Sequence, residues 1–401
     1  MRESRQVRLL AGVGVAAMIA TTATLLASPA QAAEGEIRAT DAQEKVPNSY
    51  LVKLKDSAVG AASTESTANQ VAASVGGGVD RVFGTALRGF TVKLSEGQAK
   101  RLAANPAVEY VEQDQVFHVD TTQTNPPSWG LDRIDQANLP LSSSYNYTST
   151  GAGVTAYVID TGVRISHSTF GGRASNGYDF VDNDAIAQDG NGHGTHVAGT
   201  IAGSQYGVAK GAKIVGVRVL DNTGQGTTAG VVAGIDWVTA HAVKPAVANM
   251  SLGGGVSTTI DAAVRRSIAS GVTYAVAAGN SNLNANTSSP ARVTEAITVG
   301  ATERTDARAS YSNFGTVLDL FAPGSGITSS WNTSDTATNT ISGTSMATPH
   351  VVGAVARYLQ NHTTATPAQV SAALVAAATP NKVTNPGSGS PNRLLFLAPT
   401  A

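Results

Sequence analysis

The sequence predicts an α/β fold with a mainly parallel sheet covered by helices on both faces, preceded by a small α+β module. From Trp129 onward, short apolar runs alternate with longer helical patterns, which is typical of βαβ units. Residues 48–119 instead follow the order β-α-β-β-α-β. Gly contributes 42 of 401 residues and charged side chains only 14%, so the composition indicates a globular chain rather than a disordered one.

The first 32 residues are typical of a secretory signal peptide. Arg2, Arg5 and Arg8 form a basic start, residues 9–26 are apolar, and residues 30–32 (AQA) offer a small-residue cleavage site. The alternative is an uncleaved membrane anchor, because the apolar run is long enough to make one conceivable. The cleavage site and the Thr-, Gly- and Ala-rich composition favour a signal peptide. We therefore expect a secreted, extracellular protein with no membrane attachment after cleavage.

Residues 33–121 are expected to be a propeptide that follows a polar linker over residues 34–47. Its folded module, about 48–119, has expected strands at 50–54, 79–83, 89–94 and 108–113 and helices at 65–74 and 96–104. This order predicts a ferredoxin-like sandwich, which at about 70 residues is marginally stable alone. A second linker spans residues 117–127, and we place processing between Val119 and Gln123. The catalytic domain then covers residues 122–401.

The elements expected in the catalytic domain alternate regularly between strand and helix. The strands are expected at residues 154–159, 213–219, 246–251, 273–278, 296–300 and 318–322, and the helices at 193–202, 226–243 and 258–270 and after Ser345. In such sheets the functional residues lie beyond the carboxyl ends of the strands.

Charge and cysteine content exclude several classes of partner and site. From Thr122 onward, 15 Lys and Arg side chains balance 15 Asp and Glu side chains, and no basic patch indicates nucleic-acid or anionic-membrane binding. The chain has no cysteine, so disulfides and thiolate metal sites are excluded.

Residues 342–350 (SGTSMATPH) end a polar loop and lead into an apolar run, 351–359, that predicts a buried helix. Pro349 is expected in the first turn, where a missing N–H has no helical partner. Ser345 is therefore expected at or just before the helix N-terminus, where free N–H groups favour negative charge such as that of an oxyanion. The alternative is that Ser345 only caps the helix.

An aspartate and a histidine are further candidates. Asp160 ends an expected strand, where it can orient another side chain or merely form a turn. His193 follows a glycine-rich stretch near a helix start. His196 is three residues away, so zinc binding has to be weighed, but no Glu lies between them and no third ligand stands out. We expect His196 and His350 to be packed structural residues.

Asn280 ends the stretch AVAAGN (275–280), in which the expected strand at 273–278 runs into a tight turn, and it is either a turn former or an amide donor to an oxyanion. The chain order is Asp160, His193, Ser345. This differs from the orders of chymotrypsin and the α/β-hydrolases and matches that of subtilisin.

The region 129–397 resembles the subtilisin-like serine proteases and is most similar to their proteinase K and aqualysin branch. The resemblance rests on the motifs VIDTGV (158–163), GHGTHVAGTIAG (192–203), NMSLGGG (249–255), AAGN (277–280) and SGTSMATPHVVG (342–353). Residues 48–119 resemble, more weakly, the family's inhibitor-like propeptide. The resemblance implies a subtilisin-like fold and a secreted serine endopeptidase made as an autoprocessed zymogen.

The resemblance also implies roles for individual residues. Ser345 would be the nucleophile, His193 the general base and acid, and Asp160 the partner of the imidazole. Asn280 and the Ser345 N–H would hold the oxyanion. The substrate would add as an extended strand between two segments. The residues implied in substrate binding are Ser251, Leu252, Gly253, Gly254, Gly224, Gly226, Ala277, Ala278 and Gly279. Because these residues are small or uncharged, we expect large apolar or aromatic substrate side chains with broad tolerance.

Members of this family bind structural calcium, and alignment implies one site from Asp319 and the carbonyls of Thr294 and Ala296. The alternative is that Asp319 merely caps a loop. The proteinase K branch often carries cysteines, so here packing and calcium must replace any disulfide. The expected partners are polypeptide substrates and the protein's own propeptide, as intramolecular inhibitor and chaperone, and we expect a monomer.

Two rival functions differ in class from a protease. One is a catalytically inactive peptide-binding module on the same fold, which the intact Asp160, His193, Asn280 and Ser345 disfavour. The other is an esterase with a Ser-His-Asp triad. No Gly-x-Ser-x-Gly motif surrounds Ser345, and the paired glycines of the expected substrate strands favour peptides over esters.

Overall fold

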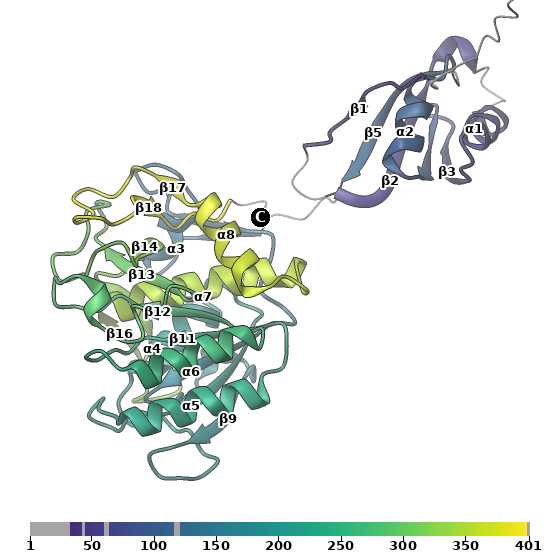
Figure 1. Cartoon of the computed structure of the whole chain (residues 1–401). Coiled ribbons are helices and arrows are strands. Elements are labelled where there is room, and N and C mark those ends of the chain that lie inside the picture. The colour runs from purple at the N-terminus through teal and green to yellow at the C-terminus, as the bar shows by residue number, and fades with distance from the viewer. Residues whose placement is uncertain (1–32, 42–44, 60–63, 116–120, 399–401) are drawn as a thin grey trace, which may run out of the picture. The chain divides into compact units, whose positions relative to one another are not determined.

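The computed structural model describes residues 33–41, 45–59, 64–115 and 121–398. The described residues form two compact units, one within residues 1–117 and the other within residues 118–401 (Figure 1). The expected signal peptide lies outside the described residues. Within the described ranges, no helix combines the length and the apolar character that crossing a membrane requires.

The first unit has the order β-α-β-β-α-β that the sequence predicts. A short strand precedes it, so the expected linker at 34–47 is partly sheet. The elements are β1 (Ile37–Arg38), β2 (Lys45–Leu54), α1 (Thr64–Ala73), β3 (Val79–Phe83), β4 (Gly89–Lys93), α2 (Glu96–Ala103) and β5 (Val108–Gln115). The five strands form one sheet in the order β1-β5-β2-β4-β3, in which β2 pairs antiparallel with β4 and β5. This is the expected ferredoxin-like arrangement.

Side-chain alternation in β2 and β4 builds the core of this unit. Val52, Leu54, Phe90 and Val92 are fully buried and pack with Leu102 of α2. Neighbouring residues on the same strands face outward, as expected for a sheet covered on one face. Helix α2 begins with a capping box between Ser95 and Gln98.

The second unit holds a nine-stranded sheet with the order β17-β18-β14-β13-β12-β11-β8-β10-β9. Its seven strands from β14 to β9 pair in parallel. The strands are β8 (Thr155–Asp160), β9 (Ala174–Asp179), β10 (Lys213–Arg218), β11 (Ala246–Met250), β12 (Thr273–Ala277), β13 (Ile297–Thr302), β14 (Leu320–Pro323), β17 (Thr379–Pro380) and β18 (Arg393–Leu394). The sequence predicted six of them, all in the parallel part.

Helices cover both faces of this sheet, so the unit has three layers (Figure 1). The helices are α3 (Trp129–Ile134), α4 (His193–Ala202), α5 (Thr228–His241), α6 (Thr258–Ala269), α7 (Thr344–Asn361) and α8 (Pro367–Ala377). Alternate residues of β8 enter different cores: Val158 packs with the α4 and α7 layer, and Ile159 with the α5 and α6 layer. Burial of both faces explains the continuous apolar runs of the sequence.

Some elements were not expected from the sequence. Part of the expected linker at 117–127 is strand β6 (Thr121–Thr124), which pairs antiparallel with β7 (Ser144–Tyr147). A hairpin of β15 (Ile327–Ser330) and β16 (Thr338–Ile341) precedes α7. The expected processing segment, 119–123, lies partly outside the described residues.

Candidate active site

Ser345 is the second residue of α7, whose N-cap is Gly343. The alternative that Ser345 itself caps the helix is therefore wrong. Its hydroxyl donates to the Ser251 carbonyl at 3.0 Å, just beyond the end of β11. The Ser345 N–H finds no acceptor among the residues that the structure describes. A free N–H at the positive end of an 18-residue helix is suited to hold negative charge.

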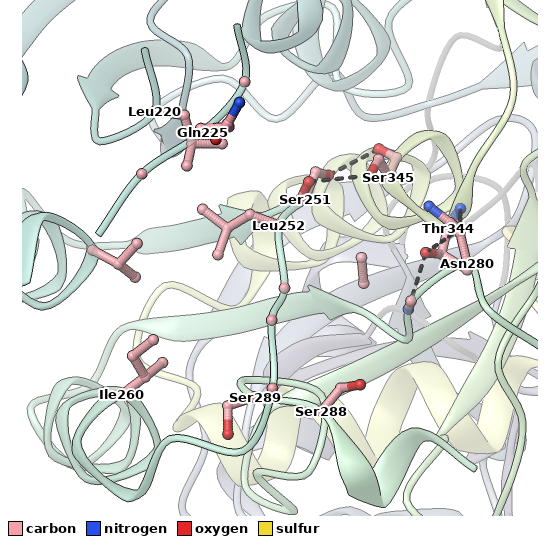
Figure 2. Close-up of a pocket in the computed structure, with 18 of the residues that line it drawn as sticks. Leu220, Gln225, Ser251, Leu252, Ile260, Asn280, Ser288, Ser289, Thr344 and Ser345 are labelled. Carbon is pink, nitrogen blue, oxygen red and sulfur yellow. Dashed lines mark hydrogen bonds between the residues drawn. The ribbon is translucent and has the colours of Figure 1, made fainter. Parts of the chain in front are cut away.

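Pro349 lies in the second turn of α7, not in the first turn as expected. A proline there removes the N–H that would donate to the carbonyl of Ser345, four residues earlier. The Ser251 hydroxyl donates to that carbonyl instead, at 2.8 Å. Ser251 and Ser345 therefore bond to each other in both directions (Figure 2). The proline is tolerated because a neighbouring segment satisfies the carbonyl that it leaves unpaired.

His193 and Asp160 come together from two elements. His193 is the first residue of α4, and Asp160 is the last residue of β8. The Nδ1 atom of His193 lies 2.7 Å from Oδ1 of Asp160, which is fully buried, while the His193 side chain is 24% exposed. Gly192, before the helix, has φ of 114°, and a Cβ there would lie 2.4 Å from the Trp331 ring. Only glycine suits this entry to the helix.

The electrostatic surroundings favour a charged His193. Burial alone would lower its pKa, but the charge and hydrogen bond of Asp160 and the charge of Asp189 outweigh burial and leave the pKa raised. No hydrogen bond joins His193 to Ser345 in the described structure, where the serine hydroxyl bonds to Ser251. Both side chains line the same pocket. The Ser345 hydroxyl would have to rotate away from Ser251 and toward the imidazole before it could donate a hydrogen bond to His193.

Asn280 is held by its carbonyl oxygen, which leaves its amide nitrogen available. Oδ1 of Asn280 accepts from the N–H of Thr344 at 2.8 Å and from its hydroxyl at 2.9 Å (Figure 2). The Thr344 hydroxyl also accepts from the Gly279 N–H at 3.1 Å. Thr344 thus orients the Asn280 amide, a role that sequence reasoning missed because a threonine beside a candidate serine carries no distinct signal.

One pocket of about 920 Å³ is lined by all of the predicted catalytic and substrate-binding residues except Asp160, whereas the predicted metal-site residues Asp319, Thr294 and Ala296 lie outside its lining. Its lining includes His193, Asn280 and Ser345 and all nine residues implied in substrate binding: Ser251, Leu252, Gly253, Gly254, Gly224, Gly226, Ala277, Ala278 and Gly279. Asp160 lies behind this surface, and Thr161 takes its place in the lining.

The pocket also has walls that the sequence did not indicate. Leu220 and Ile260 lie on one side of it, beside the predicted Leu252 and away from Ser345 and Asn280 (Figure 2). Ser288 and Ser289 belong to another wall, and Ser289 and Gly254 exchange backbone hydrogen bonds of 3.3 and 3.1 Å. Leu220, Ile260, Ser288 and Ser289 lie in loops or on a helix and belong to none of the motifs recognised in the sequence.

The other histidines of the motifs are packed, as expected. His196 is fully buried with Nε2 3.0 Å from the Ile327 carbonyl, and burial lowers its pKa to about 3. His350 is also fully buried, with Nδ1 2.8 Å from the Met346 carbonyl, and burial lowers its pKa to about 4. Within the described ranges, no three His, Asp or Glu side chains gather in a way that could hold a metal ion.

Asp319 is oriented by the neighbouring strand. Its Oδ2 accepts the N–H of Thr298, in β13, at 2.7 Å, and Thr298 accepts the Asp319 N–H at 3.0 Å. Burial raises the pKa of Asp319 to about 6, against the lowering effects of that hydrogen bond and of Arg393. A carboxylate kept in such surroundings would be stabilised by a cation.

Two family models match this sequence. The model of the subtilase family matches residues 151–394, and the model of the peptidase inhibitor I9 family matches residues 49–120.

Individual relatives agree with these matches. An extracellular serine proteinase of Thermus sp. (strain Rt41A) is 53% identical over 380 residues, which are 90% of this chain and 92% of the relative. Alkaline serine exoprotease A of Vibrio alginolyticus is 55% identical over 324 residues, 79% of this chain and 60% of the relative. The crystal structure of a cold adapted subtilisin-like serine proteinase superposes with a TM-score of 0.66 at 59% identity, covering 67% of this chain and 98% of that one.

Proposed function

Because the chain belongs to the subtilase family and is a serine endopeptidase, we propose that Ser345, His193 and Asp160 are its catalytic triad. The observation that supports this most directly is the 2.7 Å contact between Asp160 and His193, next to the pocket that Ser345 lines. Three elements distant in sequence meet there, in the residue types that acyl transfer requires.

The proposed reaction has two steps. Ser345 Oγ attacks the scissile carbonyl while His193 Nε2 takes its proton, and His193 then donates that proton to the leaving amine. Water attacks the acyl-enzyme with the same base, which restores Ser345. Asp160 keeps Nδ1 of His193 protonated, so that Nε2 is the free base, and stabilises the imidazolium.

We assign the oxyanion to two donors. The Ser345 N–H has no acceptor among the described residues, and the Asn280 amide is turned by Thr344 so that its carbonyl oxygen is occupied. Donors held in place before the reaction stabilise the developing charge without reorganisation.

The shape of the pocket supports a broad preference for apolar side chains. Many of the lining residues are Gly, Ala or Ser, and among the described residues no Lys, Arg, Asp or Glu side chain lines the pocket. A pocket of this kind accepts apolar or aromatic groups by burial and offers no partner for a substrate charge. The backbones at Gly253 and Gly224 would flank the substrate as strands.

The first unit is proposed to act as an intramolecular inhibitor and folding aid, consistent with its I9 match. Cleavage between Val119 and Gln123 would separate it from the catalytic domain at 122–401. Secretion through the signal peptide at 1–32 agrees with the extracellular description of the Thermus relative. We expect the processed enzyme to be a monomer.

Calcium is proposed as a structural ion held by Asp319 and the carbonyls of Thr294 and Ala296. The donor set is all oxygen, which suits calcium, and a cation would stabilise the negative charge of the half-buried Asp319 carboxylate. Three protein donors are fewer than the six to eight oxygens that calcium takes, so water would complete the shell. When bound, the ion would supply a cross-link between the segment before β13 and the start of β14.

The test is peptide hydrolysis by the secreted full-length chain and by its Ser345→Ala variant. The parent should cleave after Phe or Leu in preference to Asp or Lys, and mass measurement should find a new N-terminus near Thr121 or Thr122. Ser345→Ala should abolish both hydrolysis and self-processing, whereas Ser342→Ala, on an exposed loop serine, should retain both. A Ser345→Ala chain that still processes itself in a protease-free host would contradict the proposal.

A further inference from the structure

A buried carboxylate that the proposed mechanism does not use lies four residues before His193. Asp189 is only 3% exposed, and it forms no ion pair with any Lys or Arg that the structure describes. Burying a carboxylate without a counter-charge is strongly unfavourable unless hydrogen bonds replace its water. The groups that donate hydrogen bonds to the Asp189 carboxylate therefore show which parts of the chain this side chain holds in place.

Those donors flank His193 on both sides. Oδ1 of Asp189 accepts the backbone N–H of Asn191 at 2.9 Å and that of Gly192 at 2.8 Å. Oδ2 accepts the N–H of Thr195 at 2.9 Å and its hydroxyl at 2.5 Å. One side chain thus fixes the loop before His193 and the first turn of α4 after it.

Asp189 also reaches the strand that carries the partner of His193. The Thr161 hydroxyl donates to Oδ1 of Asp189 at 2.9 Å and accepts the N–H of Gly194 at 2.9 Å. Thr161 directly follows Asp160 in the chain. The Asp189–Thr161 bridge therefore joins the end of β8 to the start of α4, and these are the two segments whose side chains meet in the Asp160–His193 contact.

The charge of Asp189 acts on His193, and no Lys or Arg among the described residues neutralises it. Two other buried aspartates differ in this respect: Asp179 pairs with Arg218 at 2.6 Å, and Asp306 pairs with Arg133 at 2.6 Å. The charged groups that act on His193 are Asp160 and Asp189, and both raise its pKa, whereas His196 beside it stays neutral.

We propose that Asp189 is a positioning residue for His193, an inference that rests on the proposed function. Asp189 holds the backbone on both sides of the imidazole in register with Asp160, and its uncompensated negative charge stabilises the imidazolium that forms during turnover. It touches neither substrate nor the reacting atoms.

The simpler reading is that Asp189 is only an extended cap for α4. Such a role would change folding stability when the side chain is altered, but it would leave the pH dependence of turnover where it is. The acidic limb of the kcat/KM profile reports the pKa of the base in the free enzyme, so it separates the two roles.

The experiment compares Asp189→Asn with Asp132→Asn in the full-length, self-processing chain. Asp132 is a matched control: it is 4% exposed, has no arginine partner, and accepts from the N–H and hydroxyl of Ser142 and the N–H of Ser143. Asp189→Asn should lower kcat up to about 100-fold with little change in KM, because a small displacement of the general base strongly reduces the rate of the chemical step. Its acidic limb should move to lower pH, whereas both quantities should stay unchanged in Asp132→Asn.

The Thr161 variants, which leave Asp189 intact, keep the test decisive if Asp189→Asn does not fold, and a direct titration adds a second measurement if it does. Thr161→Val removes the bridging hydroxyl and should lower kcat, and Thr161→Ser should restore it. In the Ser345→Ala background, proton NMR titration of the His193 imidazole should show a lower pKa when Asp189 becomes Asn. An unchanged imidazole titration, an unchanged acidic limb, or a Thr161→Val enzyme with the kcat of the parent would overturn the inference. A parent chain without any peptidase activity would instead overturn the proposed function.

Discussion

Helices α4 and α7 carry the two reacting side chains, and they begin in opposite ways. At α4, the carboxylate of Asp189 accepts the N–H groups of Gly192 and Thr195 around His193. At α7, the N-cap is Gly343, which has no side chain, and the Ser345 N–H finds no acceptor among the described residues. One helix start is supplied with negative charge, and the other is left open toward the pocket.

The difference follows from the charges that appear during the proposed reaction. His193 becomes a cation, so negative charge at the start of its helix, and Asp160 beside its ring, lower the energy of that state. The substrate carbonyl becomes an oxyanion near Ser345, so unoccupied N–H donors and the helix dipole are needed there. A carboxylate at α7 would occupy the donors that the oxyanion requires.

The largest effect should come from removing the carboxylate that orients His193. We expect Asp160→Asn to lower kcat by about 10⁴, because an amide leaves the imidazole in the wrong tautomer; this magnitude was measured in another serine protease and is carried over. Steady-state kinetics on a peptide substrate is the measurement. Asp335→Asn, which alters an exposed ion pair with Arg164, should be nearly neutral. A decrease in kcat of less than tenfold in Asp160→Asn would show that the function of His193 does not depend on this carboxylate.

Asn280→Ala tests the opposite side of the comparison. Substrate binding should persist while kcat falls by about 10²–10³, a magnitude taken from a subtilisin, which is a relative of this protein. The loss should appear in kcat with KM nearly unchanged, since the amide acts on the transition state. Asn282→Ala, two residues further along and bonded to Arg308, is the control. Equal turnover in Asn280→Ala and the parent would exclude the Asn280 amide as an oxyanion donor and leave only the Ser345 N–H of the two proposed donors.

The pH dependence should reveal the charge at the start of α4. Because the pKa of His193 is raised above the ordinary value of 6.5, the protonated and inactive form persists to higher pH. Activity should therefore fall as pH decreases, with a midpoint above 6.5 in the kcat/KM profile. The same group affects folding in the other direction: its contribution to stability is complete below the unfolded pKa and is lost as pH rises through the folded one. A midpoint below 6.5 would contradict the assigned electrostatics.

The smallest effect on catalysis is expected at the proposed calcium site, which lies outside the lining of the pocket. Calcium at a hundredfold excess over its dissociation constant would stabilise the folded state by about 2.7 kcal/mol. The melting temperature of the Ser345→Ala protein, with its pro-segment removed, should therefore rise in calcium compared with chelator. The rise should disappear in Asp319→Ala, and kcat of the active Asp319→Ala enzyme should change little. Equal melting temperatures with and without calcium would contradict the proposed calcium site.

Local patterns predicted much of the fold and the identity of the site residues. The strands of the parallel sheet stand out because burial on both faces demands continuous apolar runs, as in β8. Asp160, His193, Asn280 and Ser345 were found because each follows a strand or starts a helix within a long motif. The edge strands β9 and β17, the neighbouring strand β18 and the hairpin of β15 and β16 were missed, since short polar strands carry almost no periodic signal.

Pro349 shows why the remaining errors arose. By itself, proline favours the first turn of a helix, and the sequence offers nothing to contradict that position. The structure places it one turn later because the Ser251 hydroxyl, 94 residues away in the chain, satisfies the carbonyl of Ser345. The roles of Thr344, Thr161 and Asp189 were missed for the same reason, because their partners come from other elements.

The sequence by itself determined the two-unit organisation, the mainly parallel sheet and the residues from which a catalytic site could be built, because hydrophobic periodicity and motif spacing are properties of neighbouring residues. Tertiary structure alone decided that Asp160 reaches His193, that Thr344 turns Asn280, and that the Ser345 N–H at α7 stays free of described acceptors while Asp189 accepts the N–H groups of Gly192 and Thr195 at α4. These are outcomes of hydrogen bonds between residues distant in the chain, and such bonds exist only once the strands and helices have packed.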